Sequence, residues 1–203
     1  MARLFQPFLK LPRSIDRIVG GSVNKNFGSV NLYFQDESRF GLKTHVGKCL
    51  TAMGKRPLAA YQHKFSSTYL WGSYSPIDGN SFVWEINGVS TQVFQAYPKA
   101  FSQTRPEEYK ILVIDNAGFH STSKLDIPNN IHLLRIPPYS PEPNPCEQIW
   151  QWIKQRFKNK VFQNMEELKI WLHQTVNEMD STPIKSITQN HHYKNAFYDA
   201  INS

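Results

Sequence analysis

The chain has 203 residues, of which 40% are hydrophobic and 19% charged, and this composition fits one globular domain with modest extensions. A formal net charge of +7 favours polyanionic partners, with nucleic acid first and a membrane surface second. No apolar run approaches the roughly 20 residues that cross a bilayer, and the N-terminus is too polar for a signal peptide. Cys49 and Cys146 lack the spacing of a disulfide framework or zinc site. We therefore expect a reduced, cytoplasmic protein without a membrane segment.

The N-terminal part of the chain changes character near residue 30. Residues 1–29 show no sustained helical or strand period, which predicts a leader or linker. The run VNLYFQDE, residues 30–37, predicts a buried strand with a carboxylate, Asp36, at its exit. Residues 42–56 are basic and irregular, and such a segment is typical of an exposed loop near DNA.

The next segments predict a hairpin and a helix. Two aromatic-rich runs, residues 68–75 and 81–88, are joined by the turn sequence Pro-Ile-Asp-Gly-Asn, which favours an antiparallel hairpin. Residues 91–102 can form a helix with Ser90 as its N-cap, although Pro98 is expected to kink or split it. The first half of the domain is therefore expected to be mostly strand.

The second half of the chain predicts parallel strands followed by helices. Residues 110–114 and 131–136 are continuous apolar runs without alternation, which indicates central strands covered on both faces. Residues 145–157 predict a helix that begins after Asn144, and a second helix is expected over 165–179. This order of elements predicts an α/β sandwich with a mixed sheet.

Three acids occupy distinctive positions in these elements. Asp36 and Asp115 lie at the ends of apolar strands, and Glu147 lies in the first turn of a helix. Because acids are costly in an apolar interior, acids placed there usually bind something or cap an element. Magnesium takes oxygen ligands, so a few carboxylates from separate elements can hold it together with substrate phosphates. Taken singly, an Asp after a strand is more often a turn former or helix cap than a ligand, and Glu147 alone would be an ordinary first-turn acid that opposes the helix dipole.

The sequence around these acids resembles that of one family. The blocks FQDESRFG, IDNAGFH and PPYSPEPNPCEQIW resemble the DDE transposases of the mariner superfamily, especially its bacterial insertion-sequence branch, and three long blocks are more specific than one short motif. The resemblance covers a catalytic domain at about residues 30–180 and leaves 181–203 as a C-terminal extension. It implies a ribonuclease H-like fold, a mixed five-stranded sheet flanked by helices.

The resemblance also implies an activity and its partners. It implies metal-dependent hydrolysis of DNA phosphodiesters and strand transfer in DNA transposition, with Asp36, Asp115 and Glu147 as catalytic residues that hold two Mg²⁺ or Mn²⁺ ions. The implied partners are transposon-end and target DNA and a second copy of the chain in a homodimer. Relatives carry helix-turn-helix domains, for which residues 1–29 are too short. We therefore expect either a partner encoded by an upstream helix-turn-helix reading frame or, as the alternative, a catalytically defective DNA-binding remnant or regulator.

Polar residues near the acids are candidates for binding and supporting roles. Gln151 and Lys154 follow Glu147 by four and seven residues, so they are expected on its helix face, where they contact DNA phosphates or only solvent. The candidate DNA-binding residues are Lys55, Arg56, Gln151, Lys154 and Lys158. The candidate supporting residues, which order a loop or cap a helix, are Asn116, His120 and Asn144.

Three further residues leave alternatives open. Glu142 competes with Glu147 as the third ligand, although the family pattern favours Glu147. Glu37 is expected to point away from Asp36 unless the strand has already ended. Trp150 is a candidate for stacking on a DNA base, while a core position is more usual for tryptophan.

Overall fold

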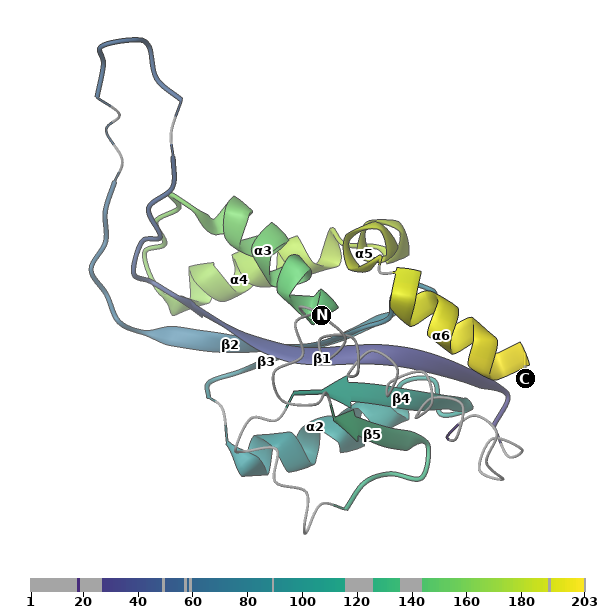
Figure 1. Cartoon of the computed structure of the whole chain (residues 1–203). Helices are drawn as coiled ribbons and strands as arrows, with labels where there is room; N and C mark the ends of the chain where they lie inside the picture. Colours follow the sequence, from purple (N-terminus) through teal and green to yellow (C-terminus); the bar gives the residue numbers. More distant parts are fainter. Residues whose placement is uncertain are drawn as a thin grey trace, which may run out of the picture.

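The central strand of the fold is β1 (Ser29–Gly41), in a five-stranded sheet of order β3-β2-β1-β4-β5 (Figure 1). β2 (Ser67–Tyr74) and β3 (Ser81–Ile86) are antiparallel neighbours on one side, and β4 (Glu108–Ile114) and β5 (Ile131–Arg135) join in parallel on the other. The sheet is therefore mixed, as predicted. This computed structural model describes residues 18, 27–48, 50–56, 58, 60–88, 90–115, 126–135, 144–189 and 191–202.

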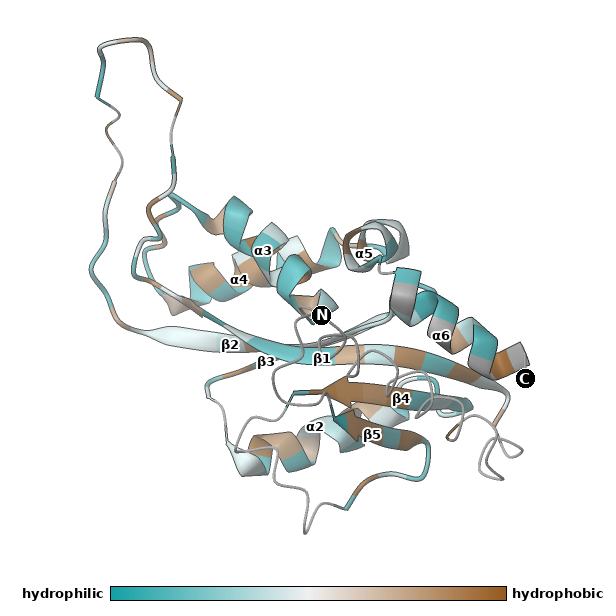
Figure 2. Ribbon diagram, viewed as in Figure 1, coloured by the Kyte–Doolittle hydropathy of each residue, from teal (hydrophilic) through white to brown (hydrophobic). Residues whose placement is uncertain are grey.

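The parallel side of the sheet lies in the interior. Every residue of β4 is buried, and most of β4 is brown in the hydropathy colouring of Figure 2. An apolar run without alternation is expected of a strand that helices cover on both faces. The predicted antiparallel hairpin is confirmed, and the two predicted strands do pair in parallel. The prediction that both are central is wrong for β5, which is the edge strand and is mostly half-buried.

Helices cover both faces of the sheet. One face carries α2 (Thr91–Gln103), and the other carries α3 (Pro145–Phe157), α4 (Met165–Asn177), α5 (Ser181–Thr188) and α6 (His191–Asn202) (Figure 1). α2 begins after its N-cap Ser90, as predicted, but Pro98 does not split it. Pro98 is itself buried, so packing offsets the hydrogen bond that proline cannot make. Among the described residues, no helix is long and apolar enough to cross a bilayer.

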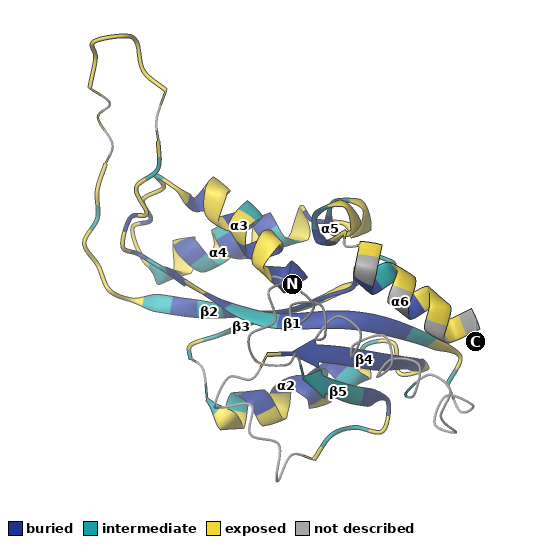
Figure 3. Cartoon of the chain, viewed as in Figure 1, coloured by how far each residue is buried: buried dark blue, intermediate teal, exposed yellow. Residues whose placement is uncertain are grey.

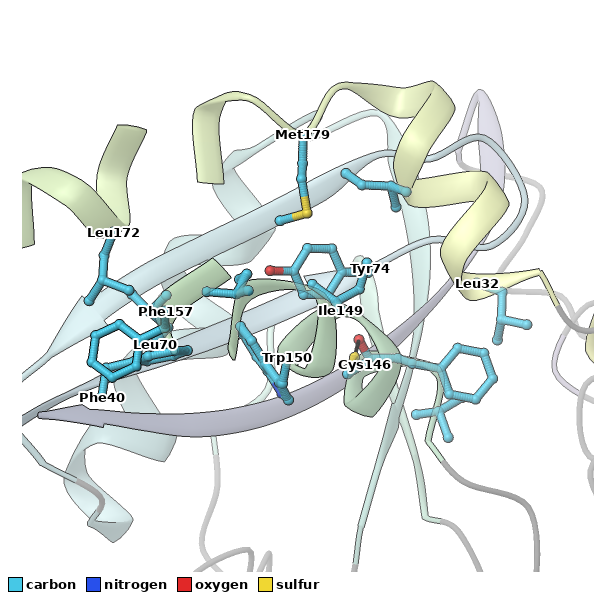
Figure 4. Close-up of a cluster of buried hydrophobic side chains, with 14 of the residues drawn as sticks. Leu32, Phe40, Leu70, Tyr74, Cys146, Ile149, Trp150, Phe157, Leu172 and Met179 are labelled. Carbon is cyan, nitrogen blue, oxygen red and sulfur yellow. Dashed lines mark hydrogen bonds between the residues drawn. The ribbon is translucent and has the colours of Figure 1, made fainter. Parts of the chain in front are cut away.

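Alternate residues of β1 belong to two separate cores. Leu32 and Phe34 pack into the larger core under α3 and its neighbours (Figure 4), whereas Tyr33 packs on the α2 side with Phe94 and Phe101. Successive side chains of a strand point to opposite faces, so both helical layers bury β1 (Figure 3). The even-numbered positions in the middle of β1 therefore face α3.

β1 is longer than the sequence predicts. The expected strand ends at residue 37 with Asp36 at its exit, but the strand continues to Gly41 because Phe40 adds a buried apolar position and pairing with β2 continues. Asp36 is therefore a mid-strand residue. Pairing with β4 ends at Phe34, so within the described residues no strand covers the β1 edge beside Asp36.

The residues after 180 extend the helical layer above α3. Ile184 of α5 and Tyr193 and Phe197 of α6 belong to the larger core, and the Tyr193 and Phe34 ring centroids lie 4.6 Å apart. The boundary between a catalytic domain ending at residue 180 and an extension stays a prediction. These helices nevertheless bury the same strand that carries Asp36.

Between β1 and β2 the chain projects from the body of the domain as a long arm, residues 42–66 (Figure 1). Its described residues form no helix or strand, as predicted for 42–56, and Figure 3 shows most of it as exposed. A turn within the arm is closed by a 3.0 Å hydrogen bond from the Lys55 N–H to the Ala52 carbonyl. Gly54 in this turn has a φ of 78°, a conformation that costs glycine little.

Candidate active site

A hollow of about 360 Å³ lies between the middle of β1 and α3. Two of the three predicted metal ligands, Asp36 and Glu147, line it together. The predicted DNA-binding residues on α3 and at its C-cap also line it, so a single concavity holds acids at one end and cations at the other. The full lining is Asp36, Glu37, Ser38, Glu147, Trp150, Gln151, Lys154, Gln155 and Lys158.

One face of α3 supplies most of this lining. Glu147, Gln151, Lys154 and Lys158 follow one another at steps of four, three and four residues, which places them on the same side of a helix. All four are exposed and line the hollow. The predicted shared face of Glu147, Gln151 and Lys154 is therefore confirmed as geometry. Their contact with DNA stays a prediction.

A hydrogen bond joins α3 to the acidic residue of β1. The Trp150 indole N–H donates to Asp36 Oδ2 at 3.0 Å. Trp150 is only 3% exposed, and its ring meets Tyr74 edge to face at 5.7 Å. Trp150 is thus a core residue that holds Asp36, and its ring has no free face on which a DNA base could stack.

Gly72 of β2 makes room for this tryptophan. It pairs with Asp36 in the β1–β2 register, and a Cβ at Gly72 would lie 2.8 Å from the Trp150 ring. Real Cβ atoms essentially never approach a ring so closely. The absence of a side chain at Gly72 therefore allows Trp150 to reach Asp36.

The first turn of α3 is fixed directly to the backbone of β1. The Asn144 side chain caps the helix by accepting from the Cys146 N–H at 3.0 Å, and its amide donates to the Gln35 carbonyl at 2.8 Å. The buried, reduced Cys146 donates from Sγ to the Phe34 carbonyl at 2.8 Å. These contacts set the position of Glu147 relative to Asp36. The capping role predicted for Asn144 is confirmed.

Asp115 approaches Asp36 from the neighbouring strand. It is exposed and directly follows β4. The parallel register pairs Phe34 with Val113, so Asp36 and Asp115 each lie two residues beyond the last pair, and the charge of Asp115 acts on Asp36. Asp115 is not part of the hollow's lining. In the described ranges, no group of three His, Cys, Asp or Glu side chains is arranged to hold a metal ion, so the three-acid ligand set stays a prediction.

Burial and neighbouring negative charge dominate the electrostatics around Asp36. The pKa of Asp36 is raised from 3.8 to about 7, chiefly by burial and in addition by the negative charges of Glu37 and Asp115. Backbone hydrogen bonding at Glu37 and the Trp150 indole act in the opposite direction. A carboxyl group with these surroundings gains stability from a proton or from a cation.

Glu37 lies at the rim of the same hollow. The Gln35 side-chain amide donates to Glu37 Oε2 at 3.4 Å, so Glu37 shares the face of Gln35, opposite that of Asp36, as predicted. It still lines the hollow because the β1 edge is open there.

The other predicted site residues lie elsewhere. Lys55 and Arg56 are exposed on the arm and do not line the hollow. Asn116, His120, Glu142 and Cys49 lie outside the described residues. Sequence reasoning missed the bond between Trp150 and Asp36. Its one signal was spacing, because Trp150 follows Glu147 by three residues and so flanks it on the helix.

Comparison with known proteins agrees with this geometry. Residues 31–169 match the model of the DDE superfamily endonuclease family, and the chain belongs to this family. The uncharacterized protein y4pE/y4sA of Sinorhizobium fredii (strain NBRC 101917 / NGR234) is 29% identical over 102 residues, which make up 49% of this chain and 76% of that protein.

Solved structures share the fold. A pre-cleavage Mos1 transpososome aligns with a TM-score of 0.66 at 15% identity over 98% of this chain, and the Mos1 mariner paired end complex with Mn aligns at 0.63 and 15% over all of it. The chain spans 62% of the length of each of these Mos1 chains. The predicted ribonuclease H-like fold and DDE catalytic domain are confirmed. The narrower insertion-sequence branch stays a prediction.

Proposed function

We propose that this DDE endonuclease domain cuts and joins DNA strands in transposition, with Asp36, Asp115 and Glu147 as ligands of Mg²⁺ or Mn²⁺. The main observation that supports the proposal is the position of Asp36. Asp36 shares a hollow with Glu147, and the charge of Asp115 acts on it from the next strand. Three carboxylates, from β1, from the residue after β4 and from α3, would thus converge on one point.

The donor set fits a hard divalent cation. Its atoms are carboxylate oxygens, which Mg²⁺ prefers, and their number leaves coordination positions for water and phosphate. The raised pKa of Asp36 reflects burial together with nearby negative charge, both of which a cation would offset. When bound, two such ions would stabilise the attacking and leaving oxygens of a phosphoryl displacement.

The remaining side chains of the hollow suit a DNA strand. Lys154 and Lys158 lie on the same face as Glu147 and would contact phosphates, which position DNA without reading its sequence. Trp150 holds the Asp36 carboxylate, and Asn144 holds the start of α3. Water is the proposed first nucleophile, and the freed 3′ hydroxyl the second.

The structural relatives support the proposed substrates and partners. The Mos1 structures include a strand transfer complex and paired end complexes with Mn and with Mg. By analogy with these complexes, we propose transposon-end and target DNA as substrates. From the family resemblance of the sequence, we propose a homodimer as the working unit and an upstream helix-turn-helix product as a partner in end recognition.

A joining assay tests the proposal. The protein is incubated with a pre-cut oligonucleotide that ends in a 3′ hydroxyl, with a supercoiled plasmid, and with Mg²⁺, Mn²⁺ or EDTA. We expect metal-dependent plasmid nicking and covalent joining of the oligonucleotide to the plasmid. Nicking without joining would identify a nuclease that only hydrolyses. DNA binding without nicking in either metal would identify a catalytically defective remnant.

A further inference from the structure

The arm and the strands beside it form the most basic part of the chain. No Asp or Glu occurs between Glu37 and Asp78, although this stretch includes six cations: Arg39, Lys43, Lys48, Lys55, Arg56 and Lys64. Most of the net charge of +7 therefore lies here. A concentration of one sign of charge attracts a polyanion and raises its local concentration.

A second hollow, of about 420 Å³, opens where the arm leaves the sheet. Arg39, Lys43 and Lys64 line it together with His45 and Phe65, and its lining contains no acid. Arg39 follows Asp36 by three residues, a distance of roughly 10 Å along a strand. Because Arg39 is an odd-numbered position and faces away from α3, a nucleic acid strand held at Asp36 would reach this second hollow by passing around β1.

The arm has an outgoing leg, which follows β1, and a returning leg, which leads into β2. Hydrogen bonds between these two legs fix them around the second hollow. The Leu42 N–H donates to the Ser66 carbonyl at 3.0 Å, and the Thr44 N–H donates to the Gln62 carbonyl at 3.1 Å. Between these two hydrogen bonds the outgoing leg has one residue, Lys43, whereas the returning leg has three, residues 63–65. The returning leg therefore bulges at residues 63–65.

The base of the arm is also attached to the end of α3. The Asn159 N–H donates to the His45 carbonyl at 2.9 Å, and Asn159 Oδ1 accepts from the Gly47 N–H at 2.9 Å. Lys64 Nζ donates to the Gln163 carbonyl at 3.0 Å. The second hollow thus has a fixed position relative to the helix that carries Glu147.

Aromatic side chains alternate along the returning leg. Tyr61 and Phe65 are 57% and 66% exposed, and the His63 ring meets the Phe65 ring edge to face at 4.7 Å. Lys43 Nζ lies 5.9 Å from the centroid of the Phe65 ring. Exposed rings beside cations are typical of surfaces that bind single-stranded nucleic acid, where bases stack and phosphates pair with charge.

We propose that the base of the arm binds an unpaired strand of nucleic acid. Arg39, Lys43 and Lys64 contact its phosphates, and a base stacks on Phe65. The acid-free lining favours a polyanion, and a second copy of this chain docked arm against arm would bring the same cations against each other. The inference rests on the proposed function in one respect, since cleavage at the Asp36 hollow supplies a strand end nearby.

Fluorescence anisotropy in EDTA tests this site without cleavage. A labelled 20-nucleotide single strand and the duplex of the same sequence are titrated with the full chain and its variants. Phe65→Ala should weaken single-strand binding roughly 10-fold and change duplex binding little, and Phe65→Tyr should retain binding because the ring is kept. Tyr198→Ala, at an exposed tyrosine of α6, is the matched control and should bind like the parent protein.

The salt dependence of binding tests the role of the cations separately. Lys43→Gln combined with Lys64→Gln should make the slope of log K against log salt for the single strand less steep by roughly 1.4, because each phosphate contact contributes roughly 0.7. Lys185→Gln, at an exposed lysine of α5, should leave the slope unchanged.

Three outcomes would overturn the inference. One is single-strand binding that Phe65→Ala leaves intact, and another is an equal loss for single strand and duplex. The third is a change in oligomeric state by sedimentation with unchanged DNA binding, which would make the arm a protein interface. Because the measurement contains no metal, a protein that binds the single strand as proposed but never nicks DNA contradicts the proposed function alone.

Discussion

The Trp150 indole donates a 3.0 Å hydrogen bond to the Asp36 carboxylate, which links the core of α3 to the acid of β1. Buried tryptophan N–H groups usually find a partner, and here the partner is a carboxylate with a raised pKa. One bond therefore satisfies the indole, orients the acid and stabilises its charged form.

Replacement of Trp150 by phenylalanine should weaken the response to metal. Trp150→Phe keeps an aromatic ring but removes the N–H, so the pKa of Asp36 should rise and protons should compete better with metal. A hydrogen bond to a charged group contributes about 1.5–3 kcal/mol, so the Mn²⁺ concentration for half-maximal nicking should rise roughly 10-fold. The rise should be larger at pH 6.5 than at pH 8.5.

Trp152→Phe is the matched control, since Trp152 lies on the same helix and its ring contacts Arg156 rather than Asp36. It should leave the metal response unchanged at both pH values. An equal, pH-independent effect of both substitutions would indicate a general loss of packing instead of a role for the indole bond.

Without metal, the buried acid should make stability depend on pH. The pKa of Asp36 is about 7 in the folded protein, against an ordinary value of 3.8, so between these values the folded state binds the proton more tightly. Stability should therefore fall as pH rises from 4 to 7, and level off above 7. Asp36→Asn should remove this dependence and stabilise the protein at pH 8 by on the order of 2 kcal/mol. Urea unfolding in EDTA measures both effects.

Glu166→Gln removes an exposed acid of α4 and should retain the parent pH dependence of unfolding. A parent protein whose stability does not change between pH 5 and pH 7 in EDTA relative to Asp36→Asn would mean that Asp36 is already charged there.

Substitution of two helix N-caps distinguishes an effect on stability from an effect on activity. Asn144→Ala and Asn164→Ala each remove an N-cap, from α3 and α4, and each should cost about 1 kcal/mol in thermal or urea unfolding. Only Asn144 also donates to β1, at the Gln35 carbonyl. Asn144→Ala should therefore reduce nicking as Glu147 shifts relative to Asp36, whereas Asn164→Ala should not. Equal nicking by both variants, measured well below their melting temperatures, would argue against this positioning role.

Much of the fold follows from local patterns in the sequence. The apolar run of β4 and the turn between β2 and β3 predict their strands, and the Asn144 cap fixes the start of α3. The length of β1 could not be predicted because Asp36 and Glu37 interrupt its apolar run. Only pairing with β2, a contact distant in sequence, carries the strand through them to Gly41.

For the candidate site too, the sequence predicts some features and not others. Motif blocks indicate Asp36, Asp115 and Glu147, and helical spacing indicates Gln151 and Lys154. The bond from Trp150 to Asp36 and the gap left by Gly72 depend on how α3 lies across β1 and β2, and no local pattern encodes that. The hollow at the arm depends on an irregular register between its two legs, for the same reason.

Metal-dependent nicking by single-residue variants tests the three-acid site most directly. Plasmid nicking is measured in Mn²⁺ and in Mg²⁺ for the parent chain, for Asp36→Asn, Asp115→Asn and Glu147→Gln, and for Glu166→Gln as control, with folding checked by circular dichroism. We predict that each of the three variants loses nicking in both metals while remaining folded, and that the control retains it. Nicking that persists undiminished in all three folded variants would contradict the assignment of these carboxylates as metal ligands.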